Sequence, residues 1–127
     1  MSTTMGSRES SDLMRDVRGF AWKFYTEEGN YDMVGIHVPV FFVRDIMKGP
    51  DMFHALQKHP VKGYYDINTT WDFFGQTPEA IHCITMIWSD YGVPYGYRHM
   101  HGYGCHTFKW VNANNEVHYV KYTFKSD

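Results

Sequence analysis

Three histidines and one cysteine lie within a stretch of eight residues: His99, His101, Cys105 and His106. Imidazole and thiolate groups are good ligands for zinc or iron, so one interpretation of this cluster is a metal centre. The spacing matches no standard zinc finger, because glycine and tyrosine residues separate the ligands. The other interpretation is a set of structural histidines in a tight loop, and we therefore expect no dedicated metal site.

A pair of adjacent aromatic residues, Phe41 and Phe42, stands at the predicted end of a strand. Such a pair is typical of core packing, and a second interpretation is the wall of a buried ligand pocket. His37, which lies close to Pro39, and His82, which lies on a predicted helix, are both interpreted as structural residues.

Other residue patterns point to no standard chemistry. The neighbouring charges of Arg15 and Asp16 are expected to be solvated or locally paired. The sequence contains no GxSxG nucleophile motif, no GxGxxG turn and no Walker loop. The residue patterns alone therefore describe an aromatic-rich α+β unit, with a ligand pocket as an open alternative.

The composition limits the size and class of the protein. The chain has 127 residues, one domain at most, and 43% of them are hydrophobic. Its 10 Tyr, 9 Phe and 4 Trp suit a packed sheet, and a flat ring cofactor is the alternative. The net charge is −2 with acidic and basic residues well mixed, so no nucleic-acid partner is expected.

The cysteines and the start of the chain bear on its compartment. Two cysteines, Cys83 and Cys105, without a CxxC motif predict no disulfide framework and favour a reducing, intracellular compartment. Residues 1–15 are polar, and no later apolar run reaches transmembrane length. Neither a secretory signal nor a membrane partner is therefore expected, and cytoplasm and peroxisome stay open as locations.

Periodicity predicts two pairs of strands separated by helices and loops. Residues 1–14 are predicted to be a flexible lead-in to a domain of residues 15–127. Thr77 and Pro78 have the residue types preferred at the N-cap and the first position of a helix. Strands are predicted at 17–26, 31–43, 106–111 and 116–124, and helices at 51–59, within 69–75 and from 77 to about 90.

The predicted strands are too few for their aromatic surface. Four strands do not complete a closed barrel, which generally needs more. We therefore expect further chain or a partner chain to cover that surface.

Longer motifs carry a resemblance to a known family. The runs RDVRGFAWKFYTEEGNYDMVG, PVFFVRD, WDFF, PEAIH, SDYGVPYGYRHMHGYGCHTFK and VNANNEVHYVKY follow one another in the order found in haem catalases. The chain resembles that family without gaps over essentially all 127 residues. The resemblance implies an α+β fold, an antiparallel β-barrel with helical excursions, of which this chain supplies about half, roughly four strands.

The resemblance also implies a reaction. In haem catalases a tyrosinate holds the iron, and hydrogen peroxide is decomposed to water and oxygen. A distal histidine moves a proton between the peroxide oxygens, and an asparagine orients the peroxide. The segments that carry the distal histidine and the tyrosinate in the family lie outside the matching region, so neither residue is expected among these 127.

Single positions can be carried over from the family. Ile36 stands at the place of the catalytic asparagine, and an alkyl group cannot donate a hydrogen bond to peroxide. Gly49 stands at the place of a phenylalanine that stacks on haem. The remaining haem-pocket matches are Val34, Phe41, Phe42 and His106, the last as a residue that supports the proximal side through hydrogen bonds.

The resemblance gives a second, weaker cofactor site. Four residues match positions that bind NADPH in some catalases: His82, Ser89, Tyr103 and Lys125. Met86, Tyr91 and His101 replace a phenylalanine, an arginine and an asparagine of that site. Because the arginine pairs with phosphate, its loss predicts that NADPH does not bind.

Three hypotheses follow for the function. The chain is a catalytically incomplete catalase fragment, an active peroxidase-like haem enzyme completed by another chain, or a haem-free binding and assembly module. The expected partners are hydrogen peroxide and either further copies of the chain, as a homo-oligomer, or the remainder of a catalase chain.

Overall fold

Alternating aromatic and polar residues fold into a long hairpin. In the computed structural model, which describes residues 1–2 and 4–127, β1 (Gly19–Thr26) and β2 (Gly29–Ile36) pair antiparallel over their whole length. A two-residue turn joins them, and Gly29 adopts a φ of 137°, a conformation that glycine tolerates at little cost. The predicted first strand is confirmed.

The predicted second strand, 31–43, is too long. It ends at Ile36, because the ring of His37 turns to the backbone of Arg18 and the chain then enters a loop that contains Pro39. A proline cannot donate to a strand ladder, which fits its position outside the sheet.

Two short strands extend the sheet. β3 (Gly102–Tyr103) pairs with β2, and β6 (Thr123–Phe124) pairs with β3, which gives the antiparallel order β1-β2-β3-β6. Ile36 lies opposite Tyr103 in this ladder.

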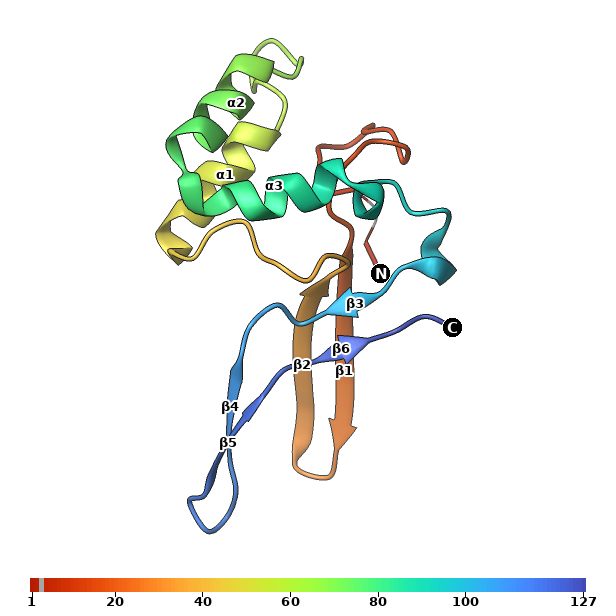
Figure 1. Cartoon of the computed structure of the whole chain (residues 1–127), viewed down its shortest axis with the longest axis vertical. Helices are drawn as coiled ribbons and strands as arrows, with labels where there is room; N and C mark the ends of the chain where they lie inside the picture. The colour runs from red at the N-terminus through yellow and green to blue at the C-terminus, as the bar shows by residue number, and fades with distance from the viewer. Residues whose placement is uncertain (3) are drawn as a thin grey trace.

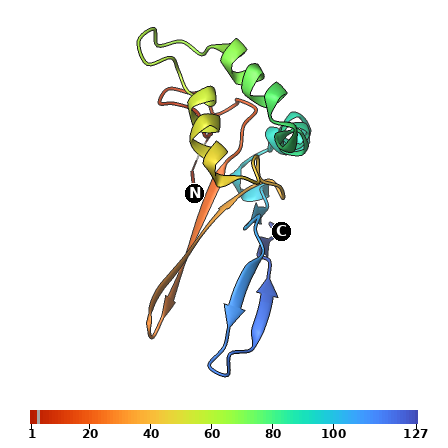
Figure 2. The same cartoon turned by 90° about the vertical axis from the view of Figure 1, so that its left-hand side faces the viewer.

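A second hairpin forms a sheet of its own. β4 (Phe108–Val111) pairs with β5 (Val117–Val120), so the predicted strand 116–124 is divided between β5 and β6. Both hairpins project from the same end of the helical part of the molecule (Figure 1), and a view from the side shows them splayed apart (Figure 2).

The indole of Trp22 ties the four strands of the larger sheet together. It stacks on Phe124 with ring centroids 3.9 Å apart, so β1 reaches β6 across the two strands between them. A Cβ added to Gly35 would come within 2.5 Å of this indole, and one added to Gly102 within 2.7 Å. The two glycines therefore leave the space through which Trp22 makes this contact.

Seven short helices in the described residues make up the other part of the molecule. The α-helices are α1 (Gly49–Leu56), α2 (Ile67–Gln76) and α3 (Ile81–Trp88), and the 3-10 turns are η1 (Ile46–Lys48), η2 (Pro78–Ala80), η3 (Asp90–Gly92) and η4 (Tyr97–His99). The helix predicted from residue 77 to about 90 is thus three shorter pieces. Thr77 is the N-cap of η2 and is followed by Pro78 at its start, as predicted, but the Thr77 side chain is buried and makes no capping bond.

The hydrophobic core lies among these helices and not under the sheet. Its buried members come from the start of the chain, the loop after β2 and all three α-helices: Val17, Val38, Phe42, Val43, Met52, Phe74, Ala80, Cys83 and Ile87. By contrast, Tyr25 and Tyr119 on the hairpins are 80% and 75% exposed. The hairpins therefore leave apolar surface in water.

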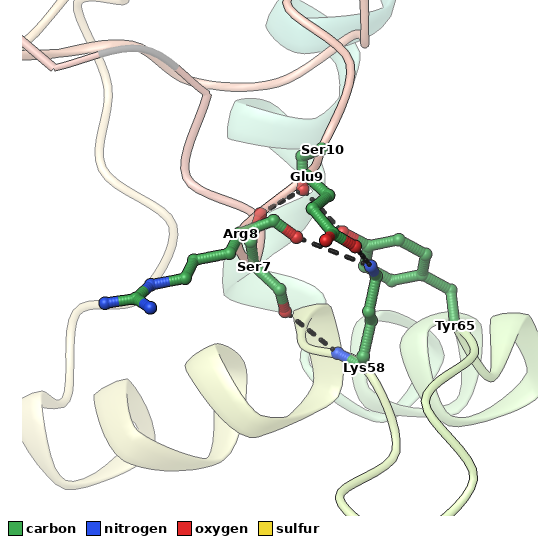
Figure 3. A network of polar contacts seen from close by, with 6 residues as sticks. All are labelled: Ser7, Arg8, Glu9, Ser10, Lys58 and Tyr65. Atoms are coloured by element: carbon green, nitrogen blue, oxygen red, sulfur yellow. Dashed lines mark hydrogen bonds and ion pairs between the residues drawn. The ribbon is translucent and has the colours of Figure 1, made fainter.

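Residues near the start of the chain contact the loop between α1 and α2 (Figure 3). Ser7 Oγ accepts a hydrogen bond from the Lys58 backbone N–H at 3.1 Å, and Lys58 Nζ lies 3.5 Å from the Glu9 carboxylate. The hydroxyls of Ser10 and Tyr65 share a hydrogen bond. The predicted lead-in 1–14 includes Thr3, which lies outside the described residues, and its flexibility stays a prediction.

The architecture confirms the predicted α+β class. Within the described residues the four-stranded antiparallel sheet stays open and does not close into a barrel. In the same part of the chain, no helix combines the length and the apolar character that crossing a bilayer requires.

We predict that Gly102→Ala lowers the free energy of unfolding by about 1–3 kcal/mol, because the new methyl group overlaps the Trp22 indole. Chemical denaturation monitored by circular dichroism measures the effect. Gly49→Ala is the matched control, since nothing lies within 4 Å of its added Cβ. An equal loss in both variants, or none at Gly102, would contradict the role given to Trp22.

Candidate functional site

The candidate site lies where β2 leaves the sheet. Val34 and Ile36 are two residues apart on β2, so their side chains share one face, while Met33 and Gly35 point to the other. The side chain of Val34 is 77% exposed, and Ile36 is half-buried opposite Tyr103. On this face the described part of the chain leaves Val34 open to solvent, whereas Ile36 packs against the helical core.

Three of the predicted pocket residues meet beside this face. The rings of Phe41 and Phe42 are 6.1 Å apart, and the ring of Phe41 lies edge-on to His106 at 5.3 Å. His106 also contacts Phe108 at 6.4 Å, at the start of β4. The structure thus brings together a loop after β2 and a loop after β3 that are distant in sequence.

His37 is fixed at both ring nitrogens. Nδ1 accepts a hydrogen bond from the Arg18 backbone N–H at 2.9 Å, so Nε2 carries the proton that is donated to the Tyr91 carbonyl at 2.6 Å. Burial lowers the pKa of His37, and the nearby positive charge of Arg18 lowers it further. The ring is therefore neutral and has no free proton or lone pair for another group.

Arg18 makes further hydrogen bonds with its side chain. Its guanidinium is buried, and it donates to a set of backbone carbonyls on two segments of the chain: Asp12, Met14, Asp16 and Gly92. The His37 backbone N–H donates to the Arg18 carbonyl at 3.0 Å. Together these bonds join the end of the β1–β2 hairpin to η3.

Asp16 is also buried, and the prediction of a solvated or locally paired charge is wrong. Its carboxylate accepts from the backbone N–H groups of Met5, Gly6 and Val17 at 2.7–3.1 Å. Burial raises the pKa of Asp16, and these three hydrogen bonds oppose that shift. The Asp16 carboxylate therefore accepts hydrogen bonds from backbone N–H groups near the start of the chain and forms no ion pair with the neighbouring Arg15.

The pocket residues do not fit haem on their own. A flat macrocycle needs apolar groups over both faces and a ligand for its iron. Here Val34 is exposed, the ring of His106 is exposed, and Phe42 is buried in the helical core. A cavity of about 180 Å³ beside Phe42 is walled by α2 and α3. The predicted residues therefore form one open wall and not a pocket.

The predicted histidine and cysteine cluster does not converge. His101 Nδ1 accepts from the Ser126 backbone N–H at 3.1 Å, and Cys105 Sγ contacts the Val38 carbonyl at 3.4 Å. Burial raises the pKa of the Cys105 thiol, which disfavours the thiolate that a metal needs. In residues 1–2 and 4–127, no three His, Cys, Asp or Glu side chains are grouped to hold a metal ion.

The positions matched to an NADPH site come from α3 and its end, from β3 and from the segment after β6. Ser89 Oγ donates to the Met86 carbonyl and accepts from the Tyr91 N–H at 3.3 Å, so this hydroxyl caps η3. Next to it is a cavity of about 220 Å³ lined by His37, Asp90, Tyr91, Pro94, His99, Met100 and His101. His82 and Lys125 are exposed, and Tyr103 is half-buried. The absence of NADPH binding stays a prediction.

Arg18 is the residue that the sequence interpretation missed. Arg18 is the second arginine of the RDVRGF motif, and Arg15 is the first. Arg15 donates to the carbonyls of Trp88 and Ser89 and stays exposed, whereas Arg18 is 3% exposed. The only sequence signal that Arg18 is buried was its place directly before the aromatic run of the first strand.

Comparisons with known proteins agree on one family. A family model described as catalase matches residues 1–127. The peroxisomal catalase of Toxoplasma gondii is 53% identical over 126 residues, which cover 99% of this chain and 25% of that protein. The bromoperoxidase-catalase of Streptomyces venezuelae is 50% identical, with 99% and 26% covered.

Solved structures agree with the sequence comparisons. A bacterial catalase aligns with a TM-score of 0.90 at 48% identity, covering 98% of this chain and 24% of that one. Catalase A from Saccharomyces cerevisiae aligns with a TM-score of 0.86 at 47% identity, covering 94% and 25%. The chain spans about a quarter of the length of these relatives. The predicted partial barrel of the catalase type is confirmed.

We predict that acid destabilises the chain through His37. Because the folded state keeps this ring neutral, its contribution to stability is present above the ordinary pKa of 6.5 and is lost as the pH falls below it. Denaturation midpoints measured between pH 7.5 and about 5 test this.

The control is His37→Asn, whose side-chain oxygen can accept from the Arg18 N–H but whose amide does not titrate. The variant should lose about 0.5–1.5 kcal/mol at neutral pH, from the bond to Tyr91, and should show a flatter pH profile. The raised pKa of Asp16 acts in the opposite direction and is common to both proteins. Parallel profiles would contradict the prediction.

Proposed function

This chain belongs to the catalase family, and on that premise we propose that it forms one wall of a catalase-type haem site without decomposing hydrogen peroxide by itself. Hydrogen peroxide is the substrate proposed for the complete site. The other wall and the iron ligand would come from further chain or from a partner.

The observation that carries this proposal is Ile36. It occupies the position at which the resemblance places the asparagine that orients peroxide, and its side chain has no hydrogen-bond donor. Its neighbour His37 cannot take over, because both of its ring nitrogens are already bonded to Arg18 and Tyr91. Proton transfer between peroxide oxygens needs a group with an available site, and neither residue supplies one.

The proposed wall consists of the residues that do keep a suitable arrangement. Phe41 and His106 hold each other edge-on at 5.3 Å, and Val34 presents an exposed apolar surface on the sheet. When haem is bound to a complete site, it supplies the iron that reacts with peroxide. The part proposed for these residues is to cover one face of the macrocycle and to exclude water from it.

A second candidate function is an active peroxidase-like haem enzyme that another chain completes. It is favoured by the 77% exposure of Val34, since an apolar side chain at a family pocket position is then free to be covered.

An intracellular location is proposed as well, on the two unpaired cysteines and on the name of the Toxoplasma gondii relative as a peroxisomal catalase.

We predict that the purified chain shows no catalase activity when mixed with haemin. Oxygen release from hydrogen peroxide should equal that of the same concentration of free haemin, and the Soret band should not adopt a tyrosinate-ligated form. An oxygen electrode and absorption titration measure the two quantities. The thermally unfolded chain is the control for non-specific haemin binding.

Ile36→Asn is the matched variant. It restores the amide at the family's peroxide position but provides no iron ligand, so we expect it to remain as inactive as the parent chain. Rapid oxygen release from the parent chain would overturn the proposal. Activity that appears only in Ile36→Asn would show that the missing amide alone, and not the missing ligand, keeps the chain inactive.

A further inference from the structure

Two cysteines that the proposed function does not use lie against the same short segment of the chain. The thiol of Cys83, on α3, donates to the Val40 carbonyl at 3.5 Å. The thiol of Cys105, just after β3, donates to the Val38 carbonyl at 3.4 Å. We propose that Cys83 and Cys105 form an intrachain disulfide when hydrogen peroxide oxidises the chain, which joins α3 covalently to the loop after β3. The inference does not rest on the proposed function, since it involves no haem.

The two thiols are held close by the carbonyls to which they donate. Only Pro39 separates Val38 from Val40, and two residues of chain span at most about 7 Å. Burial raises the pKa of Cys83 to about 12, and the charge of a Cys105 thiolate contributes to that rise. Like charges act on each other in this way mainly within about 4–6 Å. Two cysteines that are distant in sequence are therefore neighbours in the fold.

A disulfide requires a small rearrangement at Cys105. Its geometry needs the two Cβ atoms about 3.5–4.5 Å apart, so each thiol has to leave its carbonyl and turn toward the other. The thiol is a weak donor, and the loss of these two contacts opposes the turn only slightly. Cys105 has a φ of 59°, in the left-handed region that disfavours a residue with a Cβ. A shift of its backbone toward an ordinary conformation therefore relieves strain.

The two thiols differ in their readiness to react. Cys83 is fully buried, whereas Cys105 is half-buried. Burial also raises the pKa of Cys105, but the Ile36 backbone N–H and the positive charge of Lys121 oppose that rise. Because the thiolate is the form that attacks peroxide, Cys105 is the thiol that reacts first. Since its pKa is still raised, we expect the reaction at millimolar peroxide and over minutes to hours.

The reaction consumes one peroxide and releases two waters. The Cys105 sulfur attacks one peroxide oxygen, the O–O bond breaks, and the leaving hydroxide takes up the thiol proton. The Cys83 sulfur then attacks the sulfur of the resulting sulfenic acid. The S–S bond forms, the S–O bond breaks, and the leaving hydroxide takes up the Cys83 proton. Two thiols are thus oxidised by two electrons, and hydrogen peroxide is the only oxidant required.

The disulfide changes the arrangement of the proposed wall. Cys105 directly precedes His106, whose ring contacts Phe41 at 5.3 Å. When Cys105 turns toward α3, the loop that carries His106 loses its contact with the Val38 carbonyl, at the start of the loop that carries Phe41. Oxidation therefore alters the position of His106 relative to Phe41.

The first test is the effective concentration of the two thiols, measured on the purified full chain in glutathione redox buffers. This quantity is the equilibrium constant for forming the intrachain disulfide at the expense of glutathione disulfide. We expect it to be at least tenfold higher in the folded chain than in the same chain in denaturant, because the fold holds the thiols together. Alkylation of the remaining thiols and intact mass quantify the products. An equal or lower value in the folded chain would overturn the proposal.

The second test uses hydrogen peroxide as the oxidant. The reduced chain, freed of metal ions by a chelator, should yield a monomer that has lost two hydrogens and both maleimide-reactive thiols. Dithiothreitol should restore both thiols. A sulfinic acid on Cys105 with Cys83 still reduced, or dimers linked by disulfides as the main product, would overturn the proposal.

Two serine variants are the matched controls. Cys105→Ser keeps a donor for the Val38 carbonyl, and in it Cys83 should be oxidised at least tenfold more slowly than in the parent chain. Cys83→Ser should stop at a sulfenic acid on Cys105, which dimedone traps, and Cys83→Ala replaces it if circular dichroism shows that the serine variant does not fold. Oxidation of Cys83 at the parent rate in Cys105→Ser would overturn the assigned order of reaction.

Discussion

The junction between Arg18 and His37 is the constraint on which the rest of the molecule depends. A guanidinium remains charged in a protein, so burying it requires acceptors for its donors. Here the acceptors are backbone carbonyls from the start of the chain and from η3, and the imidazole of His37 adds a bond to each side. The hairpin, the chain start and the end of the helical segment therefore meet at one place. Their meeting sets the direction in which β2 ends and the position of Ile36.

The two halves of the molecule are stabilised differently. The helical half buries a core of aliphatic and aromatic side chains, as an ordinary small domain does. The sheet has no such core, and its order depends on Trp22, which reaches from β1 to Phe124 across two glycines. Phe20, Trp22 and Phe24 make aromatic contacts on one face of the hairpin, the last two with Phe124 and Tyr122. Val34 lies on the opposite face, where it is exposed.

Much of the fold could be predicted from the sequence, because local signals governed it. The alternation in β1 and its turn signal predicted the first hairpin, and the aromatic content predicted a sheet that stays incomplete. The end of β2 could not be predicted, since it depends on a bond between His37 and Arg18 across the hairpin. Thr77 was correctly predicted as an N-cap, but its burial and its missing capping bond depend on tertiary packing. The pocket residues were predicted by resemblance, but their open arrangement depends on tertiary contacts that no local sequence signal carries.

The same short segment shows how a scaffold can persist while its chemistry changes. His37 is required by the fold, because both of its ring nitrogens and its backbone N–H bond to neighbouring segments. Ile36, one residue earlier, lies opposite Tyr103 and packs against the helical core, a place that suits a β-branched apolar residue better than asparagine. An alkyl side chain there removes a hydrogen-bond donor from the site at little cost to the sheet. The hydrogen bonds that hold the fold are made by His37 and the position that would serve the reaction is Ile36, so the two can change independently.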